Sequence, residues 1–128
     1  MRNKTWIFTR QFVAILVVIC GIVLFSPPRA ALAHAILVSS QPAINSTVSG
    51  PDVAVLLKYS SRVDLEHSTL TLLDPNGKVK KITINSEPSP GSLSAKLTGL
   101  VKGAYVLRWQ ILAMDGHITR GTIPFQVK

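Results

Sequence analysis

The stretch AYVLRWQIL, residues 104–112, decides the fold class of this chain. Its odd-numbered positions are all large and apolar, whereas its even-numbered positions include Arg108 and Gln110. Because successive side chains of a strand point to opposite faces, this alternation predicts a half-buried β-strand. Trp109 lies on the apolar face, and its large ring makes it the natural anchor of a hydrophobic core.

Shorter runs rich in Val, Ile, Leu and Thr show the same alternation, and no segment has a helical period of useful length. Six further strands are predicted, over residues 36–39, 53–59, 69–73, 78–84, 93–97 and 118–127. The sequence DPNG at 74–77 is a strong turn signal, and the polar residues 60–67 are expected to form a loop. About seven strands with one apolar face each predict an all-β fold, either a two-sheet sandwich or a Greek-key barrel.

Residues 1–33 have the three parts of a secretory signal. A basic start without acids precedes an apolar run over 12–25, and the small residues Ala31 and Ala33 follow. The apolar run is shorter than the roughly 20 residues that span a bilayer. We therefore expect cleavage after Ala33, which leaves one domain over residues 34–128; an uncleaved membrane anchor is the alternative.

Composition narrows the chemistry of that domain. The single cysteine, Cys20, lies in the predicted signal, so residues 34–128 form no disulfide, and a metal site would use nitrogen, oxygen or Met114. Four of the 14 basic residues and none of the six acids lie in residues 1–33, so the domain carries a net charge of about +4. Only Lys78, Lys80 and Lys81 cluster, with few aromatics nearby, so we expect a solvated strand face and no nucleic-acid partner.

Cleavage after Ala33 would make His34 the first residue of the exported protein. Its free amine and its imidazole Nδ1 could then close a six-membered ring on one metal ion. Asp115 and His117 lie two positions apart, so in an extended segment their side chains share a side, and Gly116 between them lets the chain bend. A set of three nitrogens and one carboxylate suits Cu(II). Taken alone, Asp-Gly-His at 115–117 is an ordinary turn sequence. The periodicity of the sequence does not show that this turn lies near His34 in the fold.

Two more side chains can bind metals. His67 lies in the predicted polar loop, where we expect it to be exposed and unliganded, with weak accessory ligation as the alternative. Met114 precedes Asp115, and we expect it to pack beside the core strand rather than to bind the metal.

Five segments together resemble the CopC family of small exported copper resistance proteins. They are HA at 34–35, LVSSQPA at 37–43, GAYVLRW at 103–109, DGH at 115–117 and FQV at 125–127, so the resemblance spans essentially residues 34–128. It implies a seven-stranded, immunoglobulin-like Greek-key β-sandwich that binds one Cu(II). It also implies that the copper ligands are the amine and imidazole of His34, with Asp115 and His117. Some members carry a methionine-rich loop for Cu(I), whereas this domain has Met114 alone.

The function expected from these observations is a non-catalytic, monomeric Cu(II) carrier or buffer in the periplasm, or outside the cell in a host without an outer membrane. Its partners would be the copper ion and a soluble or membrane acceptor, with a CopD-like copper transporter as the candidate. Contact with the membrane is otherwise expected only through the uncleaved signal.

Two alternatives stay open. An N-terminal histidine brace also activates oxygen in copper monooxygenases of polysaccharides, although the four aromatic residues of the domain are mostly needed for the core. Asp115 in the copper plane would also leave less room for oxygen. The other alternative is an immunoglobulin-like interaction module with no metal, which an uncleaved signal would favour.

Overall fold

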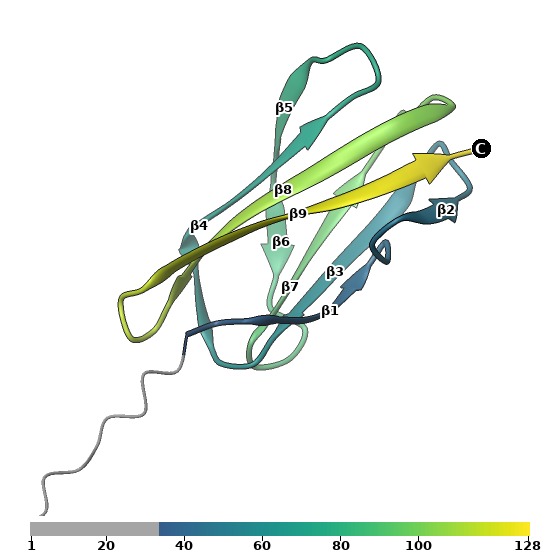
Figure 1. Cartoon of the computed structure of the whole chain (residues 1–128). Helices are drawn as coiled ribbons and strands as arrows, with labels where there is room; N and C mark the ends of the chain where they lie inside the picture. The colour runs from purple at the N-terminus through teal and green to yellow at the C-terminus, as the bar shows by residue number, and fades with distance from the viewer. Residues whose placement is uncertain (1–33) are drawn as a thin grey trace, which may run out of the picture. The chain divides into compact units, whose positions relative to one another are not determined.

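The computed structural model describes residues 34–128, so the predicted signal and its cleavage lie outside the described residues. Within them there are nine strands: β1 Leu37–Gln41, β2 Ser46–Val48, β3 Val53–Tyr59, β4 Val63–Leu73, β5 Val79–Ile82, β6 Ile84–Ser86, β7 Ser92–Leu97, β8 Gly103–Ala113 and β9 Ile118–Val127. They form a four-stranded sheet in the order β1-β3-β7-β6 and a five-stranded sheet in the order β2-β9-β8-β4-β5 (Figure 1). The predicted all-β, immunoglobulin-like sandwich is confirmed.

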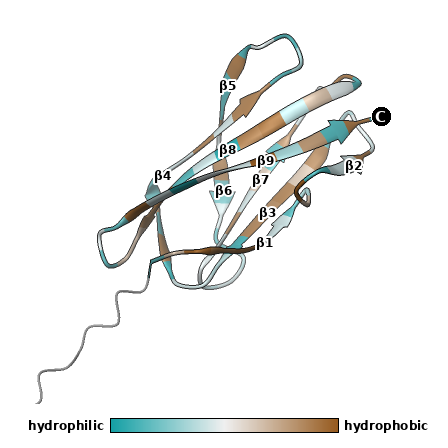
Figure 2. Ribbon diagram, in the orientation of Figure 1, coloured by the Kyte–Doolittle hydropathy of each residue, from teal (hydrophilic) through white to brown (hydrophobic). Residues whose placement is uncertain are grey.

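The core lies between the two sheets, where the alternating apolar positions of each strand meet. Every second residue of β3 is buried, from Val53 to Tyr59, and the apolar face of β8 is buried in the same way. Figure 2 shows hydrophobic residues along both strands. Trp109 is the predicted anchor, and its ring packs edge-on against Tyr59 with ring centroids 5.4 Å apart. The alternation of apolar residues in the sequence therefore does decide which side chains enter the core.

The connections between strands also follow the residue types that predicted them. The turn at 74–77 closes the β4–β5 hairpin, where the Asp74 N–H donates to Lys78 O at 2.9 Å and Gly77 has φ +82°. Tyr105 of β8 bonds back to Val101 in the turn before this strand. Its hydroxyl accepts the Val101 N–H and donates to the Val101 carbonyl, both at 3.0 Å. Such a tyrosine corner is a hallmark of immunoglobulin-like sandwiches.

The structure has nine strands in residues 34–128, where seven were expected. The short strand β2 lies between the strands predicted at 36–39 and 53–59, and it pairs in parallel with β9. The strand predicted over 78–84 divides, because β5 pairs with β4 in one sheet whereas β6 pairs with β7 in the other. A chain that changes sheets at the edge of a sandwich keeps its strand-forming residues, so the sequence pattern does not show the break.

The prediction of a loop over residues 60–67 is wrong in its second half, because β4 already begins at Val63. The polar residues mark an irregularity in the pairing of β4 with β8, between Asp64 and Thr69. There the Asp64 carboxylate accepts the His67 N–H at 3.1 Å, and the Ser68 hydroxyl donates to the Asp64 carbonyl. Side chains that bond the neighbouring backbone in this way let a strand bulge without leaving its sheet.

Both segments of the expected metal site lie at one end of the sandwich. The start of β1 and the β8–β9 turn are at the same end, although they belong to different sheets (Figure 1). Residues 34–128 include no helix with the length and hydropathy of a membrane span.

Candidate metal site

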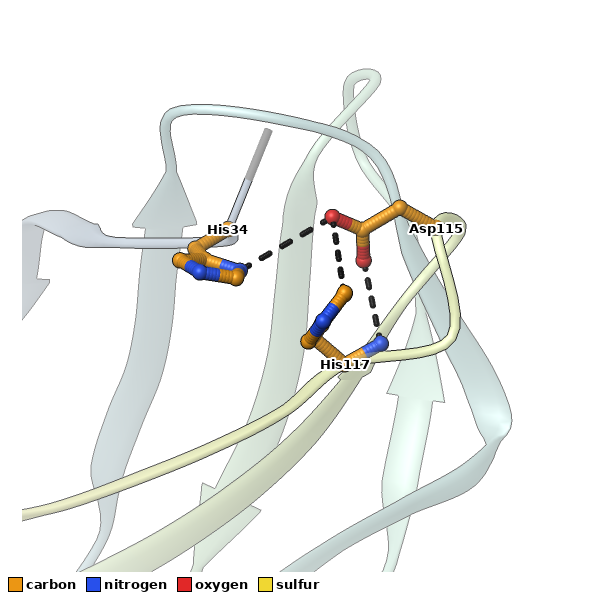
Figure 3. A group of neighbouring side chains, drawn as sticks. All are labelled: His34, Asp115 and His117. Atoms are coloured by element: carbon orange, nitrogen blue, oxygen red, sulfur yellow. Dashed lines mark hydrogen bonds and ion pairs between the residues drawn. The ribbon is translucent and has the colours of Figure 1, made fainter. Parts of the chain in front are cut away.

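The side chains of His34, Asp115 and His117 form a group at this end of the domain. Each residue offers one nitrogen or oxygen atom, and these atoms all lie within 4.8 Å of one another (Figure 3). Two ligands on opposite sides of a metal with bonds of roughly 2 Å lie roughly 4 Å apart, so small side-chain rotations would bring all three into one shell. The structure thus brings together the three residues that the sequence singled out.

Asp115 is the centre of the group. Its Oδ2 lies 3.3 Å from Nδ1 of His117 and 3.8 Å from Nδ1 of His34, while Oδ1 accepts the His117 N–H at 3.0 Å. The hydrogen bond from the His117 backbone is the main reason that the pKa of Asp115 lies below its ordinary value, and it outweighs the opposing effect of burial. The His117 and His34 imidazoles lower this pKa further by smaller amounts. The carboxylate is therefore ionised at neutral pH and available to a cation.

The β8–β9 turn holds Asp115 and His117 in this relation. The Ala113 N–H donates to the His117 carbonyl at 2.8 Å, and the Gly116 N–H donates to the Ala113 carbonyl at 2.9 Å. Gly116 has φ +86°, a left-handed conformation that costs glycine little. The turn closes with the Asp115 side chain bonded to the backbone two residues on, which is the usual reason for aspartate in such turns.

The site is open to solvent, since the side chains of His34, His117 and Asp115 are 49%, 47% and 22% exposed. The two imidazole rings are 4.5 Å apart between centroids and inclined at 67°. An exposed pair of imidazoles with an ionised carboxylate is a set of borderline nitrogen and hard oxygen donors, which fits Cu(II) better than Cu(I).

Comparison with known proteins identifies the family. The model of the CopC domain matches residues 37–128. The chain belongs to the CopC family. Copper resistance protein C of Xanthomonas campestris pv. juglandis is 32% identical over 106 residues, which cover 77% of this chain and 83% of that protein. Protein YobA of Escherichia coli K12 is 31% identical over 99 residues, 75% of this chain and 80% of YobA.

A solved structure confirms the fold of the CopC domain. The crystal structure of CopC from Methylosinus trichosporium OB3b aligns with a TM-score of 0.67 at 28% identity, over 74% of this chain and 94% of that chain. The resemblance of the sequence to the CopC family is therefore confirmed over nearly the whole described domain.

Two sequence expectations concern side chains outside the group. His67 is exposed, as predicted, and its Nδ1 pairs with Asp64 Oδ2 at 2.8 Å on β4 rather than joining the three site residues. The prediction that Met114 packs beside the core strand is wrong, because its side chain is 70% exposed. Met114 follows the last residue of β8 and already belongs to the turn, so the alternation of the strand no longer applies to it.

Sequence reasoning missed the residues that hold the N-terminal segment of the CopC domain, which are Ala35, Ser60 and Thr119. Thr119 donates its hydroxyl to the Ala35 carbonyl, and Ser60 donates to the His34 carbonyl. One signal was available: Thr119 shares the inward-facing positions of the last strand with Ile123, Phe125 and Val127. A lone hydroxyl on an apolar face usually has a partner.

Proposed function

We propose that this CopC domain, freed from residues 1–33 by cleavage after Ala33, is an exported, non-catalytic carrier of one Cu(II). Its ligands are the amine and imidazole of His34, the carboxylate of Asp115 and the imidazole of His117. The observation that carries the proposal is the grouping of these three residues from two distant parts of the chain within 4.8 Å. The name of the relative copper resistance protein C supports copper as the cargo.

The chemistry of the donors favours Cu(II) over other first-row divalent ions. Nitrogen-rich tetragonal sets give Cu(II) the highest affinity in that series. Domain residues 34–128 contain no cysteine and Met114 as the single methionine, so the soft donors preferred by Cu(I) are few. Reduction of the bound ion would therefore weaken binding and provide one route of release.

Protons provide a second route of release. A free α-amine has a pKa of about 7.7 to 8.0 and must lose its proton to bind the metal. Affinity is therefore expected to fall as the pH drops below neutrality. The acceptor in this proposal is a soluble partner or a CopD-like membrane transporter, with the monomeric carrier acting in the periplasm. Stopped-flow release that responds to neither reductant nor pH would contradict both routes.

The decisive experiment compares two N-termini. Exported protein is first sequenced from its N-terminus to show that it begins at His34. It is then titrated with Cu(II) beside a matched version that carries one extra glycine before His34. We expect tight 1:1 binding in the first and a large loss of affinity in the second, because the extra residue turns the amine into an amide. Equal binding by both proteins would rule out the amine as a ligand.

The same material tests the enzymatic alternative. The protein would be incubated with polysaccharide, copper and ascorbate. Formation of oxidised sugar products would show that it is a histidine-brace oxygenase and not a carrier. A protein that binds no copper at all would leave the immunoglobulin-like interaction module as the better assignment.

A further inference from the structure

Two hydroxyl groups hold the segment that carries His34. Ser60, directly after β3, donates its hydroxyl to the His34 carbonyl at 3.1 Å and accepts the Ile36 N–H at 3.0 Å. The Ser60 N–H also donates to the Ile36 carbonyl at 2.9 Å. From the other sheet, the Thr119 hydroxyl donates to the Ala35 carbonyl at 2.8 Å. Residues 34–36 therefore have polar partners on both sides before β1 begins at Leu37.

Burial of Ala35 also holds this segment in place, in addition to the two hydroxyl groups. The Ala35 side chain is 0% exposed and belongs to the hydrophobic core, so the chain cannot slide or rotate at this residue without opening the core. With the carbonyl of His34 bonded and Ala35 buried, the position of the His34 Cα is set. Only its two remaining substituents, the backbone nitrogen and the imidazole, stay free to reach a ligand. These are the two groups that a chelate at the N-terminus would use.

The two hydroxyls connect His34 to both halves of the site. Ser60 extends β3 of the four-stranded sheet, whereas Thr119 lies in β9 of the five-stranded sheet, two residues after His117. A shift of the N-terminal segment relative to β9 would break the Thr119 bond before it could separate the two imidazoles. Chain termini without such partners are usually poorly ordered.

We infer that Ser60 and Thr119 are positioning residues of the metal site, which hold the amine and imidazole of His34 toward Asp115 and His117. This inference rests on the proposed function and deepens it. Ligands held in the binding geometry before the metal arrives lose less conformational entropy on binding, which raises affinity without adding a donor atom. Neither hydroxyl needs to touch the metal.

The test uses protein that begins at His34, with the substitutions Ser60→Ala and Thr119→Val. Each removes one hydroxyl and leaves all donor atoms in place. We expect each to lower Cu(II) affinity by roughly five- to tenfold, at an unchanged stoichiometry of one, because Thr119→Val removes one hydrogen bond and Ser60→Ala removes two. The Cu(II) electron paramagnetic resonance spectrum should broaden into more than one species. Ser60→Thr, which keeps the hydroxyl, should restore both affinity and a single spectrum.

A matched control is available on the same sheet. Ser86→Ala breaks the hydroxyl pair between Ser86 and Ser94, which are 2.9 Å apart on β6 and β7, at the edge opposite β1. This substitution should leave affinity and spectrum unchanged. If Ser86→Ala weakened binding as much as Ser60→Ala, general destabilisation would explain the effect, and the positioning role would be lost.

Metal-free protein separates this inference from the proposed function. Backbone ¹⁵N relaxation of Ala35 and Ile36 should show an ordered segment in the parent and added motion in both hydroxyl variants. Unchanged relaxation would overturn the inference whether or not copper binds. Copper binding by the parent with equal affinity in both variants would overturn it too, while leaving the proposed function intact. Failure of the parent to bind copper would overturn the proposed function and with it the role of the two hydroxyls at a metal site.

Discussion

The imidazole of His34 lies edge to face with the imidazole of His117, with ring centroids 4.5 Å apart. The first ring precedes β1 of the four-stranded sheet, and the second ends the turn that leads into β9 of the five-stranded sheet. A metal ion bound by both rings would join the two sheets at one end of the sandwich. Metal binding at the proposed site would therefore be linked to the integrity of the fold.

Substitutions can separate the hydrogen bond that Asp115 makes to the His117 backbone from its proposed role as a metal ligand. Asp115→Asn keeps an oxygen that can accept the His117 N–H, but it loses the negative charge. We expect the variant to fold with near-parent stability and to bind Cu(II) at least about tenfold more weakly, because a charged donor is replaced by a neutral one. Asp115→Ala should also lower the free energy of unfolding slightly, since the hydrogen bond to the His117 backbone is gone. Calorimetric titration and urea unfolding check both values, and parent-like copper affinity in Asp115→Asn would exclude the carboxylate as a ligand.

Gly116 can be tested against a second glycine of similar geometry. Gly116 and Gly77 have φ +86° and +82°, and a Cβ at either position would meet nothing within 4 Å. Changing either to alanine should cost about 1–2 kcal/mol, from the left-handed conformation alone. Only Gly116→Ala should lower copper affinity, because its strain acts on the turn between Asp115 and His117. Equal affinity in the two variants, measured beside their unfolding curves, would show that the turn does not set the site.

The pair formed by Asp64 and His67 predicts a pH dependence away from the site. The side-chain hydrogen bond between them raises the pKa of His67 and lowers the pKa of Asp64. The stabilisation from His67 is full below its unfolded pKa of about 6.5 and is lost as pH rises through the raised value. The stabilisation from Asp64 is full above its unfolded pKa of about 3.9 and is lost as pH falls through its lowered pKa in the folded protein. The pair therefore stabilises β4 between the lowered pKa of Asp64 and the raised pKa of His67.

An NMR titration of the His67 ring checks this expectation. Asp64→Asn should return the pKa of His67 toward its ordinary value, whereas Asp74→Asn, which removes an acid from the β4–β5 turn, should not change it. A His67 pKa that is the same in the parent and in Asp64→Asn would show that the pair seen at 2.8 Å does not persist in solution.

The sequence was sufficient for features that depend on local chemistry. The alternation in residues 104–112 correctly predicted the buried face of β8. The DPNG signal at 74–77 correctly predicted a turn, which joins β4 to β5. The three site residues were found because a free N-terminal histidine and Asp-Gly-His have a chemistry that can be recognised without a structure. That their side chains meet depends on β1 and β9 lying at one end of two packed sheets, which no local pattern encodes.

The expectations that failed are ones that tertiary contacts decide. The break between β5 and β6 at Thr83 depends on which sheet each half reaches, not on strand propensity. The segment 60–67 was predicted to be a loop, yet β4 begins at Val63, and its pairing with β8 is irregular between Asp64 and Thr69. Ser60 is an ordinary hydroxyl in the sequence, and Thr119 is marked only as a polar residue on an apolar face. The partners of both hydroxyls become visible only when the His34 segment lies between them.

Bound Cu(II) should raise the stability of the domain. A ligand that binds only the folded state at 100 times its Kd adds about 2.7 kcal/mol to the free energy of unfolding. Protein beginning at His34 should gain this stability with Cu(II), because the bound ion holds β1 and the β8–β9 turn together. His117→Ala should lose most of the gain, since it removes one of the two proposed ligands in the β8–β9 turn. His67→Ala is the control, because His67 lies outside the group, and it should keep the full gain. Thermal unfolding with and without Cu(II) measures the difference, and an equal gain in all three proteins would mean that copper stabilises the domain from some other place.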